Sequence, residues 1–281
     1  MYNMTIIIPH YNDVERCQVL AKTILQEQPG HIQLIIVDDG SEHSAIEILN
    51  QLATIDHCNV LHNSRGKGAG GARNTALEHT LGQWILFADS DDRFMPGFYN
   101  IVMQEVFKQH QPDIVFFKPT SHSETAHKKS RRHVVYASLV DRYLKYRDPA
   151  LKYRFTVPWS KVFKADFIER HQLQFDECIA SNDALFSLKT GHLAKTIAVS
   201  DQTIYSVLER SQSLTKRVDS AVTNSRFNAM KRYNVYVAKH KIPKKFQCSL
   251  LAAIKMYWWD VRVTSLTLLL ALFLKNNWRW V

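Results

Sequence analysis

Short apolar runs alternate with helical patterns through about the first hundred residues of this 281-residue chain, and this alternation limits the possible folds more than any other feature. The runs at residues 5–8, 32–37, 60–62 and 84–88 are predicted strands, and the stretches between them are predicted helices. Strands that alternate with helices form a parallel sheet through right-handed crossovers. The expected fold class is therefore α/β, a mostly parallel, Rossmann-like sheet flanked by helices.

Each predicted strand is followed by residues that can contact a ligand. Pro9-His10-Tyr11 follows the first strand and Asp38-Asp39 the second, a glycine-rich loop at 65–71 follows the third, and Asp89–Asp92 follows the fourth. Ligands of open α/β sheets bind outside the carboxyl ends of the strands. We therefore expect these four segments to meet at one edge of the sheet.

Three carboxylates lie within the four residues Asp89-Ser90-Asp91-Asp92, directly after an apolar strand. Carboxylates packed this closely repel one another, and a buried, unpaired charge is costly. Mg²⁺ and Mn²⁺ prefer hard oxygen ligands and commonly keep positions open for substrate phosphates. A metal–diphosphate site is therefore the first hypothesis for this segment, and a solvated acidic turn that caps the next helix stays open beside it, because Asp-rich turns are common.

The loop Gly66-Lys67-Gly68-Ala69-Gly70-Gly71 matches the pattern G-x-G-x-x-G. The match is weak by itself, because the dinucleotide fingerprint belongs after the first strand and this loop follows the third. The loop also lacks the Lys-Ser/Thr pair of a P-loop. Two interpretations stay open: a flexible entry to a helix that begins near Ala72, or a loop whose backbone N–H groups and Arg73 approach a nucleotide.

The composition suggests an anionic partner and a reducing compartment. Thirty-six Lys and Arg against 26 Asp and Glu give a net charge of +10, which suits a nucleic acid, a membrane surface or a phosphorylated substrate. The four cysteines form no C-x-x-C pair, which argues against a zinc site or a disulfide framework. The first residues lack a basic region with a long apolar run, so no signal peptide is expected. The expected location is cytoplasmic, with peripheral attachment to the inner face of the plasma membrane as an open alternative.

Four motifs occur in order: Ile6–Asn12 (IIIPHYN), Val37–Ser41 (VDDGS), Gly71–Ala76 (GARNTA) and Ala88–Asp92 (ADSDD). Together they resemble the family 2 glycosyltransferases, which are inverting nucleotide-sugar enzymes of the GT-A fold. The resemblance covers about the first hundred residues and continues more weakly to about residue 215. It implies a sugar nucleotide as donor, with UDP-sugar as the expected class, and Mn²⁺ or Mg²⁺ as cofactor.

The resemblance also implies roles for individual residues on the donor side. The donor-binding residues would be Pro9, Tyr11, Asp39, Gly68, Arg73, Asp89, Ser90 and Arg210. Tyr11 would pack near the base, and Asp39 would accept from the base or ribose. Asp91 would be the main metal ligand, with Asp89 on the ribose or the metal. Arg210, in the later segment Glu209–Thr215, would contact phosphate, and this segment lacks the metal-reaching His of many relatives.

On the acceptor side, the resemblance points to Trp159, Lys161 and Asn182 as binding residues and to Asp183 as the catalytic base. An inverting transfer needs a carboxylate that takes the proton of the attacking hydroxyl. Asn182 stands where many relatives have an acid. The alternatives are that Trp159 belongs to the core and that Asp183 only favours the dipole of a helix that begins there.

A change of pattern near Asp219 predicts a C-terminal helical extension. The uncharged run at 263–274 is too short to span a bilayer, which takes about 20 residues. Trp and basic residues flank it, and lysines 239, 241, 244 and 245 precede it, so it suits a helix in a membrane interface. The alternative is packing on the core or on a second subunit of a homo-oligomer. The expected division is 1–100 for nucleotide-sugar binding, 101–218 for acceptor binding and catalysis, and 219–281 for the helical region.

The leading hypothesis is a metal-dependent inverting glycosyltransferase that acts on a glycan or lipid-linked acceptor in bacterial surface polysaccharide synthesis. A nucleotidyltransferase acting on a sugar phosphate is the first alternative, since it also uses a parallel sheet with acidic metal ligands. A basic nucleic-acid-binding protein is the second. It would need basic and aromatic residues clustered on one face, whereas the charge here is spread along the chain and the motifs are acidic.

Overall fold

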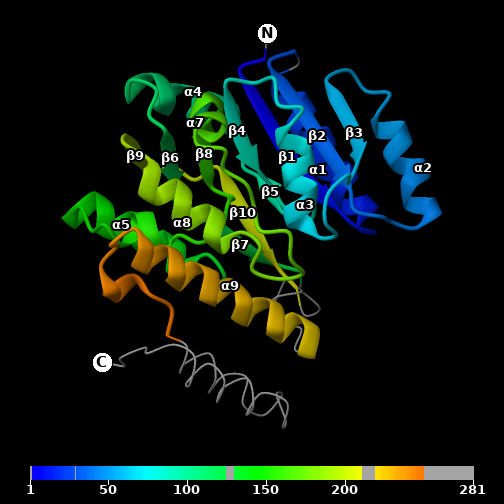
Figure 1. Cartoon of the computed structure of the whole chain (residues 1–281). Helices are drawn as coiled ribbons and strands as arrows, with labels where there is room; N and C mark the ends of the chain where they lie inside the picture. The colour runs from blue at the N-terminus through cyan, green and yellow to red at the C-terminus, as the bar shows by residue number, and fades with distance from the viewer. Residues whose placement is uncertain (1, 29, 125–129, 211–218, 250–281) are drawn as a thin grey trace.

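A computed structural model describes residues 2–28, 30–124, 130–210 and 219–249 of the chain (Figure 1). The strands are β1 (Met4–His10), β2 (Ile32–Asp38), β3 (Cys58–His62), β4 (Trp84–Phe87), β5 (Arg93–Phe94), β6 (Ile114–Phe117), β7 (Thr120–Ser123), β8 (Lys161–Lys164), β9 (Ile197–Ser200) and β10 (Tyr205–Glu209). The helices are α1 (Val14–Glu27), α2 (His43–Leu52), α3 (Ala69–Leu77), α4 (Phe98–Lys108), α5 (Val134–Tyr146), α6 (Ala150–Arg154), α7 (Ala165–Arg170), α8 (Ala184–Leu193) and α9 (Ser220–Lys239), with a 3₁₀ turn at Lys244–Phe246.

A seven-stranded sheet in the order β3-β2-β1-β4-β8-β6-β9 forms the centre of the fold. β1 pairs in parallel with β2 and β4, and β2 with β3, whereas β8 runs antiparallel to both of its neighbours. A second, three-stranded sheet has the order β5-β10-β7. The predicted α/β class with a mostly parallel sheet flanked by helices is confirmed (Figure 1).

The strands and helices expected for the first hundred residues are present, but several of their ends differ from those expected, and so does the start of one later helix. Pro9 does not close the first strand, because β1 continues to His10 with Pro9 opposite Val37 of β2. α3 begins at Ala69, three residues before the expected start. α8 begins at Ala184, so Asp183 is its N-cap residue rather than part of its first turn.

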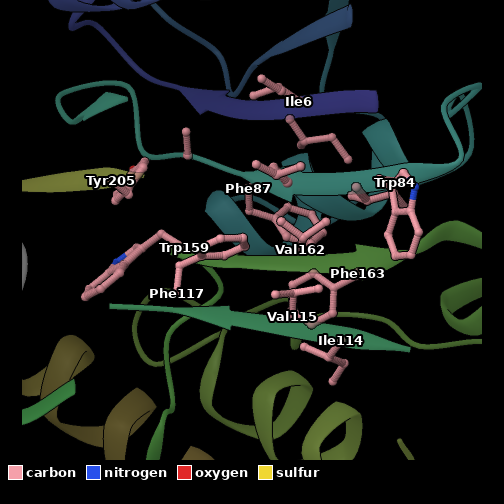
Figure 2. Close-up of a cluster of buried hydrophobic side chains, with 14 of the residues drawn as sticks. Ile6, Trp84, Phe87, Ile114, Val115, Phe117, Trp159, Val162, Phe163 and Tyr205 are labelled. Carbon is pink, nitrogen blue, oxygen red and sulfur yellow. The ribbon is translucent and has the colours of Figure 1, made fainter. Parts of the chain in front are cut away.

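The core lies on the central strands, and aromatic rings fill much of it (Figure 2). Phe87 of β4 contacts the ring of Phe163 of β8 edge-on at 5.7 Å and that of Phe186 of α8 at the same distance. Phe175 stacks on Phe186 with centroids 3.9 Å apart. Burying a large apolar side chain contributes about 1.5–3 kcal/mol, so these rings fix α8 and the chain before it against the ends of β4 and β8.

The predicted C-terminal helical extension contains a long helix, α9, which runs past α8 below the sheet in Figure 1. Asp219 caps it by accepting a hydrogen bond from the Val222 backbone N–H at 2.9 Å. No helix in the described ranges is long and apolar enough to cross a bilayer. The run at 263–274 lies outside the described residues, and the boundaries near 100 and 218 stay predictions.

Candidate active site

The carboxyl ends of β1, β2 and β4 meet at one edge of the central sheet, because these three strands are parallel neighbours. β8 is antiparallel to β4, so its first residue, Lys161, lies at the edge where β4 ends. The topology therefore brings the four predicted segments of the donor side and the start of β8 to the same edge. This is the position at which open α/β sheets bind their ligands.

Asp39 ties the glycine-rich loop to the end of β2. Its Oδ1 accepts a hydrogen bond from Asn63 Nδ2 at 2.6 Å, and its Oδ2 accepts from the Gly68 backbone N–H at 2.8 Å. Tyr11 is 53% exposed beside this loop, with Lys67 Nζ 5.6 Å from its ring centroid. The Tyr11 side chain is thus accessible from solvent, and the base and ribose contacts of Tyr11 and Asp39 stay predictions.

Two glycines of the loop are required by close backbone packing inside the protein. A Cβ on Gly70 would lie 2.1 Å from the Asp176 carbonyl oxygen, and one on Gly71 would lie 1.8 Å from the Gly66 carbonyl oxygen. Gly68 has φ of 114°, which favours glycine, and precedes α3 as its N-cap. The loop therefore folds tightly onto its own start and onto the segment before Asp183.

Arg73 of α3 connects the acidic loop with the start of α8. Its Nη2 donates to Asp89 Oδ1 at 2.6 Å, and its Nη1 donates to Asn182 Oδ1 at 3.0 Å. Only 4% of Arg73 is exposed, and its guanidinium also lies over the Phe175 ring. One buried guanidinium thus holds Asp89 through one terminal nitrogen and Asn182, the residue next to Asp183, through the other. The acceptor contact predicted for Asn182 stays a prediction, and its amide oxygen is already engaged by Arg73.

Asp91 lies two residues after Asp89, in an environment that disfavours its ionised form. Burial raises the pKa of its carboxyl, the neighbouring Asp89 raises it further, and Arg210 and Arg132 act in the opposite direction. Arg210 Nη2 is 2.5 Å from Asp91 Oδ2, and its Nη1 is 2.8 Å from Asp13 Oδ2. Arg210, the predicted phosphate contact, therefore pairs directly with Asp91, the predicted metal ligand. Ser90 lies between Asp89 and Asp91 in the sequence.

The third aspartate, Asp92, is a structural anchor that the sequence did not reveal. It is 3% exposed and accepts hydrogen bonds from Tyr205 Oη at 2.8 Å and from the Leu208 backbone N–H at 2.7 Å. Tyr205 Oη in turn accepts from the Asp89 backbone N–H at 2.9 Å. Residues of β10 therefore hold the acidic loop in place through Asp92. The sequence of Asp89, Asp91 and Asp92 does not indicate which of the three side chains points into the protein.

Asp183 lies at the start of α8, where burial raises the pKa of its carboxyl. Arg73 and Lys161 favour its charged form, and Asp89 disfavours it. A carboxylate with a raised pKa at the N-terminus of a helix is a suitable proton acceptor. Its side chain makes no capping hydrogen bond to α8, but its position at the N-cap is also compatible with an interaction with the helix dipole, so the role of catalytic base stays a prediction.

Trp159 and Lys161 are buried beneath the edge instead of exposed at it. Trp159 is 2% exposed and stacks on Tyr205 with ring centroids 5.9 Å apart. Lys161 is also 2% exposed, and its Nζ donates to the Phe155 carbonyl oxygen at 2.6 Å. Burial lowers the pKa of Lys161 to about 7, against the nearby charge of Asp183. This placement favours the core interpretation of Trp159, and the acceptor contacts predicted for both residues have no support in it.

The carboxylates of Asp89 and Asp91 suit a divalent cation that takes its remaining ligands from the substrate and from water. Among the described residues, no three His, Cys, Asp or Glu side chains converge as a metal-binding group. Mg²⁺ is commonly held by one or two carboxylates together with substrate phosphates and waters. Asp91 and Asp89 supply two such carboxylates, and their mutual repulsion is what a cation would relieve.

Residues 5–171 match the family model described as glycosyl transferase family 2. The chain belongs to this family. It is 28% identical over 222 residues to the uncharacterized glycosyltransferase EpsJ of Bacillus subtilis, covering 76% of this chain and 63% of EpsJ. It is 30% identical over 219 residues to the poly(ribitol-phosphate) beta-glucosyltransferase of Bacillus spizizenii, covering 74% of this chain and 32% of that protein. The chain therefore spans less than two thirds of either relative.

The protein also has the GT-A fold that is expected from its family 2 motifs. Its structure aligns with that of a TarS fragment from S. aureus in complex with UDP-GlcNAc, with a TM-score of 0.73. The alignment covers 95% of this chain and 78% of the TarS chain at 17% sequence identity. At this identity the likeness supports the fold, and the donor has to be argued from the chain's own residues.

Proposed function

We propose that this family 2 chain is an inverting glycosyltransferase that moves a sugar from a nucleoside diphosphate donor to an acceptor hydroxyl. The donor's diphosphate would be held at Asp91 and Asp89 through the cation, with the nucleoside beside Tyr11 and Asp39. Pro9, which is also predicted to bind the donor, is buried within β1. Asp183 would face the acceptor from the start of α8. A bound Mn²⁺ or Mg²⁺ would supply Lewis-acid stabilisation of the leaving diphosphate.

One observation carries this proposal: the bridge that Arg73 makes between Asp89 and Asn182. The bridge joins Asp89, one of the two acids proposed to hold the cation, to Asn182, which lies next to Asp183, the carboxylate whose pKa is raised. An inverting transfer needs a donor site and a proton acceptor at a fixed separation on opposite sides of the anomeric carbon. A buried guanidinium with two hydrogen bonds is well suited to hold that separation.

Each residue then has a defined task in the reaction. Asp183 takes the proton of the acceptor hydroxyl as its oxygen attacks the anomeric carbon, and the bond from that carbon to the diphosphate breaks. Arg73 keeps Asp89 oriented and favours the ionised form of Asp183. Gly68 and Asp39 keep the loop beside the nucleoside closed onto the end of β2. The buried anchor Asp92 prevents the acidic loop from shifting as charge develops.

We infer the donor class from the chain's own family motifs, and the acceptor class from kinship and charge. A sugar nucleotide with UDP is the donor class we expect, and a glycan or lipid-linked saccharide of a bacterial surface polysaccharide is the acceptor class. The match to a poly(ribitol-phosphate) beta-glucosyltransferase supports an acceptor that belongs to the cell envelope. The net charge of +10 also suits anionic polymers and phosphorylated acceptors.

A peripheral membrane contact is part of the proposal for a lipid-linked acceptor. Lysines 239, 241, 244 and 245 are all exposed around the end of α9 and the following 3₁₀ turn. Each lysine near an anionic bilayer contributes about 1 kcal/mol of attraction at low salt. Sedimentation with vesicles of 30% phosphatidylserine should lose binding when all four lysines become glutamine. Equal sedimentation of that variant would exclude this contact.

The test of the function is a donor screen without acceptor. The protein is incubated with UDP-, GDP- and TDP-sugars in Mn²⁺ or Mg²⁺, and the released nucleoside diphosphate is measured. We expect slow hydrolysis of one donor class, lost in EDTA. Release of pyrophosphate from a nucleoside triphosphate and a sugar phosphate would show a nucleotidyltransferase instead. Tight, salt-dependent RNA or DNA binding without any turnover would favour the nucleic-acid alternative.

A further inference from the structure

Arg210 connects two acids that are far apart in the sequence. It directly follows β10, and its guanidinium is 2.5 Å from Asp91 Oδ2 through Nη2 and 2.8 Å from Asp13 Oδ2 through Nη1. Asp13, the N-cap residue of α1, is 197 positions away from it. Asp13 also accepts from Arg16, which reaches Glu124 on its other side. The result is an ion-pair chain that ends on Asp91.

This series of ion pairs ends on Asp91, the carboxylate proposed as the main cation ligand. Asp91 is 11% exposed at its side chain, so solvent weakens its pairing with Arg210 less than it would on an open surface. A guanidinium on one carboxylate oxygen repels a divalent cation on the other, since both positive charges then lie within a few ångströms. Arg210 and the cation therefore use the same negative charge.

The neighbouring Asp89 pairs with Arg73 instead of Arg210, and the two arginines differ in burial. Asp89 is held by Arg73, which is 4% exposed and anchored on Asn182 as well. The Arg210 side chain is 28% exposed, and its second anchor is an acid at the rim rather than a buried amide. Of the two arginines that pair with the D-x-D acids, Arg73 is the more buried and is also held by the buried Asn182, whereas the Arg210 side chain is the more exposed.

We propose that Arg210 competes with the cation for Asp91 in the donor-free protein and moves to the diphosphate when donor and cation bind together. Asp13 keeps the guanidinium at the rim during this exchange. The arginine thereby makes cation binding and nucleotide binding depend on each other, so the cation binds weakly alone and tightly with nucleotide. The inference deepens the proposed function and rests on it, since it takes Asp91 as the cation ligand.

The test is a titration of the full chain with Mn²⁺, followed by the electron paramagnetic resonance signal of free Mn²⁺, with and without UDP. Without UDP, Arg210→Gln should bind Mn²⁺ roughly tenfold more tightly than wild type, as expected for removing one like charge from a partly buried site. The factor by which UDP increases the affinity for Mn²⁺ should be smaller in this variant than in wild type. Unchanged or weaker Mn²⁺ binding by Arg210→Gln without UDP would overturn the inference.

Arg16→Gln is the matched control. It removes the same charge from the same series of ion pairs. Arg16 pairs with Asp13 and Glu124, and Asp91 is the smallest of the electrostatic influences on it. We expect its Mn²⁺ affinity to stay within about twofold of wild type, because exposed ion pairs contribute little. An equal gain in both variants would show a general charge effect and overturn the inference.

Asp91→Asn separates failure of the inference from failure of the proposed cation site. Loss of Mn²⁺ binding in Asp91→Asn, together with tighter binding in Arg210→Gln, supports both. Loss in Asp91→Asn with no gain in Arg210→Gln overturns the competition and leaves the cation site in place. Unchanged Mn²⁺ binding by Asp91→Asn would overturn the cation site, and the role of Arg210 with it.

Discussion

Arg73 Nη2 donates a hydrogen bond to Asp89 Oδ1 at 2.6 Å, and this ion pair is the connection between the helix after the glycine-rich loop and the acidic loop after β4. Because Arg73 also donates to Asn182, it sets the spacing between the two halves of the site. A lysine in its place would keep the charge and lose the planar fork that makes two directed hydrogen bonds.

The first prediction concerns this bridge. Arg73→Lys should fold but lower kcat/KM for donor hydrolysis at least tenfold, because one of two positioning contacts is lost. Circular dichroism and turnover of the same sample check this. Arg65→Lys is the control, since Arg65 pairs with Glu78 and Glu177 away from the acidic loop. Wild-type turnover in Arg73→Lys would contradict the positioning role.

The second prediction concerns the acid side of the pH profile. Burial raises the pKa of Asp183 above 3.8, with Asp89 acting in the same direction and Arg73 and Lys161 opposing. A base must be ionised to accept a proton, so kcat/KM should fall as the pH drops through this raised pKa. Donor affinity measured at the same pH values shows whether binding is responsible. A rate that stays constant down to pH 4 would exclude Asp183 as the base.

The third prediction concerns stability and Lys161. Burial lowers its pKa from 10.5 to about 7, so between these values the unfolded chain binds the extra proton. Stability contributed by this residue therefore rises with pH from about 7 to 10.5, and the cost of burying the charge is largest below pH 7. Lys161→Met should gain most stability relative to wild type at pH 6 and least at pH 10, in urea unfolding. A gain that is independent of pH would contradict this burial.

The fourth prediction tests the anchor of the acidic loop. Tyr205→Phe keeps the stack on Trp159 and removes the hydroxyl that bonds Asp92 and the Asp89 backbone. We expect a loss of about 1–3 kcal/mol in the free energy of unfolding, because the buried Asp92 carboxylate and the partly buried Asp89 N–H each lose a partner. Tyr146→Phe, at a residue that is 67% exposed, should change stability by less than about 0.5 kcal/mol. Equal effects of the two changes would contradict the anchor.

The sequence predicts the order of strands and helices in the first hundred residues because the apolar runs are short, regular and closed by clear turn signals. It also brings Asp39, Arg73, Asp89 and Asp91 to one edge, since parallel strands end together. The contacts among these residues depend on distant partners. Asp13 meets Arg210 across 197 positions, and no local pattern indicates that pairing.

Side-chain burial is the other property that local pattern leaves open. Lys161 begins a strand whose alternation permits an outward lysine, yet tertiary packing turns it into the core, where the Phe155 carbonyl accepts its hydrogen bond. Asp92 follows two acids that reach the site, and only the pairing of β5 with β10 turns it inward. Packing of the whole sheet decides both cases.

The most direct measurement compares two aspartates by calorimetry and turnover on the same preparations. Asp91→Asn should lose Mn²⁺-dependent nucleotide-sugar binding, whereas Asp183→Asn should bind the donor with wild-type affinity and lose at least about a hundredfold in turnover. Donor binding that survives in Asp91→Asn together with near-normal transfer by Asp183→Asn would contradict the assignment of donor and base to this edge of the sheet.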